Sequence, residues 1–167
     1  MLTDYEAACV TQRSEEPLPT GRLSPRHYLA VHRHLFQDIY AWAGKPRRVR
    51  TFKDGSPFCY PENIARELKA LFGWLKAQAF LRGRAPAAFA QEAAHFLAEL
   101  NAIHAFRDGN GRAQTAFLAL LAAEAGHPLD FDRMDPETFL AAMVRSFYGK
   151  NDALAEQIEA LIDLRVG

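Results

Sequence analysis

The chain has 167 residues, enough for one domain with a sizeable core. Hydrophobic residues make up 49% and charged residues 24%, which is typical of a folded globular protein and excludes a disordered chain. Lysine and arginine number 20, as do aspartate and glutamate, so the chain offers no overall field for nucleic acid or an anionic membrane. No apolar stretch reaches the roughly 18 residues needed to span a bilayer. The N-terminus has no signal-peptide pattern, so we expect a cytoplasmic protein.

The first predicted elements are helices. An N-terminal extension over residues 1–22 is expected to be chiefly helical. Ser24 followed by Pro25 is a typical helix start, with a capping hydroxyl before proline at the first helical position. Apolar residues at helical spacing continue this second helix to Trp42, and Gly44 closes it.

After Gly44 the spacing of apolar residues is no longer helical. Residues 48–60 are predicted to form a short β-hairpin around the turn-forming pair Asp54 and Gly55. Later helices follow apolar residues at helical spacing, over 61–75, 89–103, 110–125, 135–148 and 153–164. We find no repeat or long linker. The chain is therefore expected to form a single, mainly helical domain over 1–167, with its core at about 23–161 and an inserted hairpin.

Residues 104–112 (HAFRDGNGR) carry the residue types that a phosphate site with its own base requires. Gly109 and Gly111 allow the main chain to approach a phosphate closely, and the helix that starts here directs free N–H groups at an anion. His104 is a proton acceptor near neutral pH and Asp108 can hold a divalent cation. A cation in the first helical turn, Arg112, conflicts with the helix dipole unless an anion binds there.

Two further residues of this loop complete the predicted nucleotide site. Asn110 would donate its side-chain amide to a phosphoryl oxygen, and Phe106 would anchor the shape of the loop. Spacing alone leaves a structural helix–helix turn as an equal alternative, because Asp-Gly and Asn-Gly are common turn formers.

The segment resembles the signature of the Fic (filamentation induced by cAMP) family, His-x-Phe-x-Asp/Glu-Gly-Asn-Gly-Arg-x-x-Arg. The resemblance extends to residues 35–44 (LFQDIYAWAG) and 99–104 (ELNAIH), and covers about 23–161. It implies an all-α Fic bundle with a hairpin flap. It also implies a protein adenylyltransferase, in which His104 activates a target hydroxyl that attacks the α-phosphate of ATP.

The resemblance assigns the remaining roles in the same loop. Asp108 would bind Mg²⁺ bridging the phosphates, and Asn110 with the backbone of Gly109 and Gly111 would hold the α- and β-phosphates. Arg112 would neutralise charge on the β-phosphate as it leaves. In-line transfer of this kind depends mainly on positioning and charge stabilisation.

Position 115 departs from the family pattern, because Thr115 replaces the second arginine of the signature. In the family that arginine contacts the γ-phosphate and pairs with an inhibitory glutamate. Losing such a contact costs about 1.5–3 kcal/mol unless another group replaces it. Thr115 therefore keeps two alternatives open: a weakly active Fic-fold binding module, and an enzyme that transfers another nucleotide or phosphate-linked group.

Regulation and partners follow from the same resemblance. Residues 11–15 (TQRSE) match the bare spacing of the family's inhibitory helix, but Glu16 follows where the family prefers glycine or asparagine. The layout looks more like Fic toxins that are held by a separate small antitoxin carrying the inhibitory glutamate. For such toxins the targets include the ATPase subunits of type II topoisomerases. We expect no membrane partner and no direct binding of nucleic acid.

The predicted hairpin corresponds to the family's flap, which would hold an extended target segment by β-augmentation. Lys53 on this flap would approach the phosphates, or be an ordinary solvated lysine. Tyr148 lies in the region that lines the adenine pocket in similar proteins. The basic run at residues 45–50 is expected to be a solvated charged strand.

Overall fold

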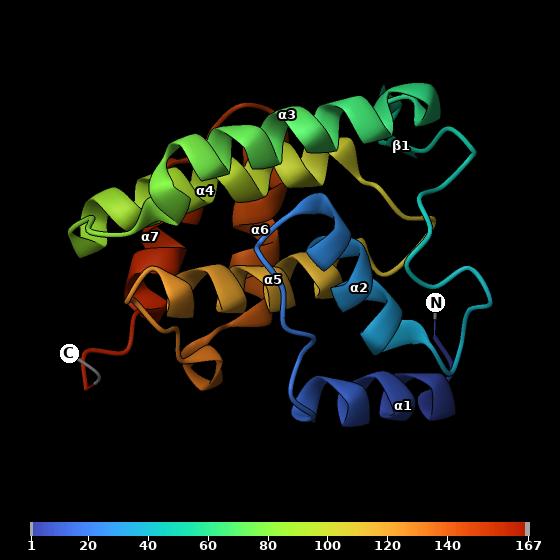
Figure 1. Ribbon diagram of the computed structural model, residues 1–167, viewed down its shortest axis with the longest axis horizontal. Helices are drawn as coiled ribbons and strands as arrows, with labels where there is room; N and C mark the ends of the chain where they lie inside the picture. Colours follow the sequence, from blue (N-terminus) through green and yellow to red (C-terminus); the bar gives the residue numbers. More distant parts are fainter. Residues whose placement is uncertain (1, 166–167) are drawn as a thin grey trace.

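The computed structural model describes residues 2–165 and shows a mainly helical protein with one small hairpin (Figure 1). Within these residues the seven α-helices are α1 (Asp4–Glu15), α2 (Pro25–Phe36), α3 (Ile64–Ala77), α4 (Pro86–Ile103), α5 (Asn110–Glu124), α6 (Pro136–Phe147) and α7 (Asp152–Leu161). The hairpin pairs β1 (Phe52–Lys53) with β2 (Ser56–Pro57). Short 3-10 turns are η1 (Pro61–Asn63), η2 (Ala79–Leu81) and η3 (Phe131–Arg133). The expected fold class, all-α with an inserted hairpin, is confirmed.

Helix α4 is the central element of the fold. It packs against α3, α5, α6 and α7, and α3 runs beside it along one side of the molecule (Figure 1). Half of its residues are buried, because its sequence is apolar on nearly every face. Helix α1 packs on α2 at the opposite side of the bundle. Both α4 and α5 therefore have fixed positions at the point where the 104–112 loop joins them.

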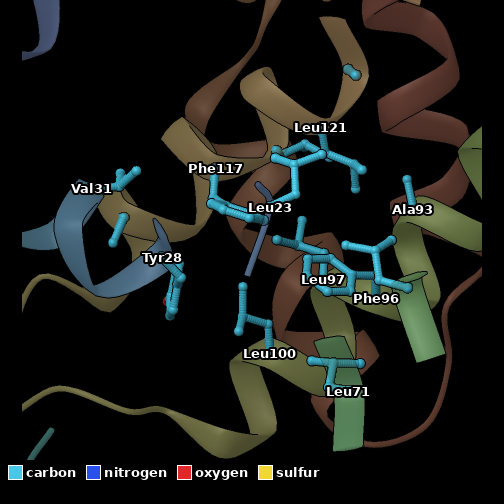
Figure 2. Close-up of a cluster of buried hydrophobic side chains, with 14 of the residues drawn as sticks. Leu23, Tyr28, Val31, Leu71, Ala93, Phe96, Leu97, Leu100, Phe117 and Leu121 are labelled. Carbon is cyan, nitrogen blue, oxygen red and sulfur yellow. The ribbon is translucent and has the colours of Figure 1, made fainter. Parts of the chain in front are cut away.

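The core is centred on Phe117 of α5. Its ring centroid lies 5.5 Å from that of Tyr28 in α2, 5.4 Å from that of Phe72 in α3 and 6.1 Å from that of Phe96 in α4. Figure 2 shows Tyr28, Phe96 and Phe117 within this cluster of buried side chains. Burying each large apolar side chain contributes about 1.5–3 kcal/mol, and aromatic pairs add to that. This packing holds the helix that begins at the loop.

Helix α2 ends at Phe36, so the predicted continuation to Trp42 was wrong. The carbonyl of Phe36 accepts the N–H groups of both Ile39 and Tyr40 at 3.0 Å, which closes a turn. The rings of Tyr40 and Trp42 then stack with centroids 4.2 Å apart. Residues two apart on a helix face different sides, so a continued helix would separate these rings. Aromatic stacking in the tertiary structure overrides the helical spacing.

The hairpin turns where the sequence predicts. Asp54 and Gly55 have φ values of 49° and 80°, the left-handed pair that a two-residue hairpin turn requires. The paired strands are shorter than residues 48–60, with Phe52 opposite Pro57 and Lys53 opposite Ser56. The other predicted helices are present, although α7 ends at Leu161 and not at residue 164. No helix within residues 2–165 is long and apolar enough to cross a membrane.

Candidate active site

His104 is the residue at which α4 ends. It adopts a left-handed conformation with φ 49° and ψ 61°, which is unfavourable for a residue with a side chain and is held by its surroundings. Its ring stacks on Phe58, which follows the hairpin, with centroids 3.8 Å apart and planes 8° apart. Nδ1 is buried and meets no partner at hydrogen-bond geometry within residues 2–165, although the backbone carbonyl of Asn101 lies close enough to favour the charged ring. The residue also lines the pocket at the loop. The ring is therefore fixed in orientation, and Nε2 is the nitrogen available to the pocket.

The imidazole of His104 is neutral at pH 7. Burial lowers its pKa to about 4, and the nearby cations of Arg47 and Lys53 act in the same direction. A neutral ring can accept a proton from a hydroxyl group. The predicted role of His104 as a general base is compatible with this protonation state.

Asp108 is an exposed carboxylate whose orientation is set by two hydrogen bonds. Its Oδ1 accepts the N–H of Gly109 at 2.8 Å, and its Oδ2 accepts the hydroxyl of Tyr40, also at 2.8 Å. Partial burial, helped by the carboxylate itself, raises the pKa of Tyr40 to about 12, so the phenol remains a donor. No local sequence pattern marks Tyr40 for this role. The carboxylate is held at the rim of the pocket with lone pairs free for a cation.

The N-terminus of α5 forms the floor of this pocket, which has a volume of about 490 Å³. The first bond of the helix joins the N–H of Ala113 to the carbonyl of Gly109. Within residues 2–165 the three preceding amides, of Asn110, Gly111 and Arg112, have no acceptor. Three free N–H groups at a helix N-terminus make a favourable anion site.

The two glycines of this loop have different reasons to be glycine. Gly109 has φ of 80°, and a Cβ atom there would lie 2.4 Å from the ring of Phe36. Gly111 has only open space around the position of its missing Cβ. Gly109 is therefore required for the loop to fold, while Gly111 leaves the backbone accessible to a ligand. Arg112 beside it is exposed and forms no ion pair within residues 2–165.

The side chains of Asn110 and Phe106 hold the shape of the loop. The side chain of Asn110 is buried, with Oδ1 accepting the N–H of Phe106 at 3.0 Å and Nδ2 donating to its carbonyl at 2.8 Å. This amide closes the loop with one of its two N–H groups, and its contact with a phosphate stays a prediction. Phe106 has no exposed surface, so its side chain cannot contact a nucleotide. Its predicted role as an apolar anchor is confirmed, because its ring stacks on His32 with centroids 3.7 Å apart.

His32 is a positioning residue that sequence analysis left unassigned. Its buried ring accepts the N–H of Gly44 at Nδ1, at 3.0 Å, which leaves Nε2 to donate to the carbonyl of Asp108 at 2.9 Å. Burial lowers the pKa of His32 to about 4, so the ring stays neutral and keeps this donor and acceptor pattern. His32 thereby ties α2, the turn at Gly44 and the loop together.

Arg47 ties the hairpin to the 104–112 loop, so the prediction of a solvated charged strand at residues 45–50 was wrong at this residue, although Lys45, Arg48 and Arg50 are exposed. Only 3% of its surface is exposed. Its guanidinium donates to the carbonyls of His104 at 2.6 Å, Ile103 at 3.1 Å and Val49 at 2.8 Å, and also to that of Cys59. Five fixed donors allow one arginine to serve both segments.

Three further residues named in the sequence analysis are Lys53, Tyr148 and Thr115. Lys53 is on β1 and does not line the pocket at the loop, although its charge helps to lower the pKa of His104. Tyr148 is 53% exposed and packs against Phe147, but it does not line the pocket at the loop. Thr115 donates its hydroxyl to the carbonyl of Gly111 at 2.9 Å, one helical turn earlier.

Comparison with known proteins agrees with this geometry. A model of the Fic/DOC family matches residues 22–122, which include α2, the hairpin and the whole loop. The chain belongs to the Fic/DOC family. It is 48% identical to the probable protein adenylyltransferase y4lH of Sinorhizobium fredii, over 96% of this chain and 84% of that protein. It is 35% identical to the probable protein adenylyltransferase Fic of Escherichia coli K12, over 90% of this chain and 74% of that protein.

The fold is shared with solved structures. BepC, a VirB-translocated effector protein of Bartonella tribocorum solved with bound AMPPNP, superposes with a TM-score of 0.83 at 25% identity. The match covers 96% of this chain and 85% of that one. The expected helical Fic fold with a hairpin is therefore confirmed.

Proposed function

We propose that this chain is a protein adenylyltransferase, which transfers AMP from ATP to a hydroxyl side chain of a target protein. The observation that carries this proposal is the neutral, fixed ring of His104 beside three free amides at the start of α5. The names of y4lH and of the Escherichia coli relative support the reaction class, and AMPPNP in BepC supports ATP as the donor.

The chain's own residues account for the main requirements of the transfer. The target hydroxyl oxygen attacks the α-phosphorus, the bond to the β-phosphate breaks and pyrophosphate leaves. Nε2 of His104 accepts the hydroxyl proton. The amides of Asn110, Gly111 and Arg112 stabilise phosphate charge, and the exposed guanidinium of Arg112 lies beside them.

Asp108 fits a magnesium ion that arrives with the nucleotide. Within residues 2–165 there is no cluster of three or more histidine, cysteine or acidic side chains able to hold a metal alone. One oriented carboxylate at the pocket rim matches the usual binding of Mg²⁺ through one or two carboxylates and substrate phosphates. When bound, the ion would neutralise charge on the phosphates.

The hairpin is the proposed binding surface for the target protein. Phe52 of the hairpin is 58% exposed, and Val49 just before it is 50% exposed. The hairpin is anchored beside His104 by Arg47 and by the stacked ring of Phe58. An extended segment added to its edge would bring a hydroxyl over the α-phosphate. The ATPase subunits of type II topoisomerases are the first targets to test.

Labelling with ATP tests the proposal. The chain would be incubated with α-³²P-labelled ATP and Mg²⁺ in a bacterial lysate, in parallel with γ-labelled ATP. We expect a protein band labelled only from the α-phosphate and absent with the His104→Ala variant. Measurable ATP binding without any labelled protein would instead identify a nucleotide-binding module.

The second candidate function is transfer from a different nucleotide donor, and the residue that favours it is Thr115. Its side chain is bonded back to the helix and is too short to replace an arginine at a γ-phosphate. The same lysate would be incubated with the other three nucleoside triphosphates, each labelled at the α-phosphate. Stronger His104-dependent labelling by one of them would replace ATP as the proposed donor.

We further propose that inhibition comes from a separate small antitoxin. Glu15 at the end of α1 is exposed and forms no ion pair with Arg112. Residues Val10 and Ser14 of the same helix do line a pocket with Arg112 and Thr115, so Glu15→Gln tests control within the chain. Unchanged labelling agrees with a separate inhibitor, and activation of about tenfold or more contradicts it.

A further inference from the structure

A second cleft, unrelated to the phosphate pocket, lies between α3 and the linker that joins α1 to α2. It has a volume of about 810 Å³ and shares no lining residue with the pocket at the loop. One wall is the linker at residues 18–25, which passes across α5 toward α3 in Figure 1. The opposite wall is α3, and Phe72, Phe80 and Leu120 provide apolar surface between them.

The linker wall is preformed. Nδ1 of the buried His27 accepts the N–H of Leu23 at 3.1 Å, which leaves Nε2 to donate to the carbonyl of Pro19 at 2.7 Å. A Cβ atom on Gly21 would lie 2.4 Å from the ring of His27, so the backbone there is in close contact with it. A wall held in this way loses little conformational entropy when a ligand binds.

The cleft is basic, although the chain has no net charge. Its lining contains four cations, Arg22, Lys69, Lys76 and Arg82, and one carboxylate, Glu124. Glu124 is already paired with Arg82. The other three cations are exposed and have no ion pair within residues 2–165. The N-terminus of α2 at Ser24 and Pro25 adds positive potential to the same cleft.

Two backbone features lie along the cleft. Gly73 lies in the middle of α3, where glycine weakens a helix, yet among residues 2–165 nothing beyond its own turn of helix lies within 4 Å of the Cβ position that it leaves open. Ala79, Phe80 and Leu81 all have φ between 52° and 64°, a left-handed turn made without glycine. Phe80 of this turn lines the cleft. The turn buries Leu81 in the core, whereas the open position at Gly73 allows another backbone to approach α3 closely.

We propose that this cleft binds an acidic, extended segment of a partner protein. Lys69 and Lys76 are seven residues apart and lie on the same face of α3, about 10.5 Å apart along the axis. In a polyproline II segment, which has three residues per turn, carboxylates three residues apart lie on the same side and are about 9 Å apart, close to this spacing. Gly73 between the lysines leaves room for the peptide backbone, and an apolar side chain of the segment packs against Phe80 and Leu120.

Fluorescence anisotropy with the purified full chain tests this site. The probe is a fluorescein-labelled peptide, Gly-Glu-Leu-Ser-Glu-Gly, and the control peptide has glutamine at both glutamate positions. We expect the acidic peptide to bind at least about tenfold more tightly than the control, with an affinity that falls as salt rises. Equal affinity for the two peptides, or no binding of either, overturns the proposal.

Three variants locate the binding. Lys76→Glu should weaken binding at least about tenfold, whereas Lys150→Glu makes the same charge change at an exposed residue outside the cleft and should leave it unchanged. Gly73→Leu should keep or raise the melting temperature, because the position is open and helical, yet block the peptide. Equal weakening by both lysine variants, or full binding by Gly73→Leu, overturns the proposal. If a single-stranded oligonucleotide displaces the peptide and binds more tightly than the peptide does, the partner is a nucleic acid and the proposal of an acidic protein segment is overturned.

Discussion

Acidification from pH 7 to pH 5 should destabilise the protein strongly, because two largely buried histidine rings are held neutral. Burial lowers the pKa of both His32 and His104 to about 4. Histidine in an unfolded chain titrates near 6.5, a general reference value. Between these two values the unfolded state binds protons that the folded state does not. The contribution of the two neutral rings to the free energy of unfolding is therefore fully present above about pH 6.5 and is lost as the pH falls toward 4.

The size of the effect follows from these values. One histidine whose pKa is about 4 when folded and about 6.5 when unfolded loses about 2 kcal/mol of folding free energy between pH 7 and pH 5. The two rings together give about 4 kcal/mol, a large part of the roughly 5–15 kcal/mol typical of a domain. The lowered pKa values of Asp38 and Asp163 act in the same direction only at more acidic pH, near and below the usual aspartate value of 3.8.

Urea denaturation at pH 7, 6 and 5 measures this loss. The His104→Phe variant keeps an aromatic ring on Phe58 but cannot titrate. Its free energy of unfolding should therefore fall between pH 7 and pH 5 by about 2 kcal/mol less than that of the unchanged protein. Equal unfolding free energies at pH 7 and pH 5 would refute the reasoning. An unchanged pH dependence in His104→Phe would show that this ring is not held neutral by the fold.

Three substitutions test other parts of the site. Arg47→Lys should lower the free energy of unfolding, measured by urea denaturation, by about 2–4 kcal/mol, because one ammonium cannot bind four carbonyls. The same variant should slow labelling of the target more than it weakens ATP binding. An unchanged free energy of unfolding would contradict this. Gly109→Ala should lower the free energy of unfolding by about 2–4 kcal/mol, because the position has a positive φ and the added Cβ would contact Phe36. A decrease below about 1 kcal/mol would mean that the loop relaxes readily. Thr115→Arg should tighten AMPPNP binding by about 10- to 100-fold in calorimetry; unchanged affinity would mean that position 115 does not face the γ-phosphate.

The amino-acid sequence by itself determined the local parts of the site. Residues 104–112 are contiguous, so the base, the carboxylate and the glycines arrive together wherever a helix follows a turn. The hairpin turn at Asp54 and Gly55 is equally local, because its positive φ values depend on those two residues. Most of the helices were predictable for a similar reason, since apolar periodicity and capping residues act over a few turns.

Tertiary structure alone decided which side chains hold that loop. His32 reaches Asp108 across 76 residues of sequence, Tyr40 reaches the same residue across 68, and Arg47 reaches His104 across 57. In the sequence, Arg47 is one cation in a basic run and His32 is one polar residue in an apolar stripe. Their burial and hydrogen bonds depend on how α2, the hairpin and α4 pack together, and no local pattern encodes that packing.

Asn110 shows the same limit at short range. The sequence correctly marked this position as part of the loop, but either a phosphate or the backbone of Phe106 could have used its amide. The folded loop directs both side-chain atoms to Phe106, because the buried N–H and carbonyl of that residue need partners. The residues of the site were readable from the sequence, whereas the division between binding and supporting roles depended on burial in the folded chain.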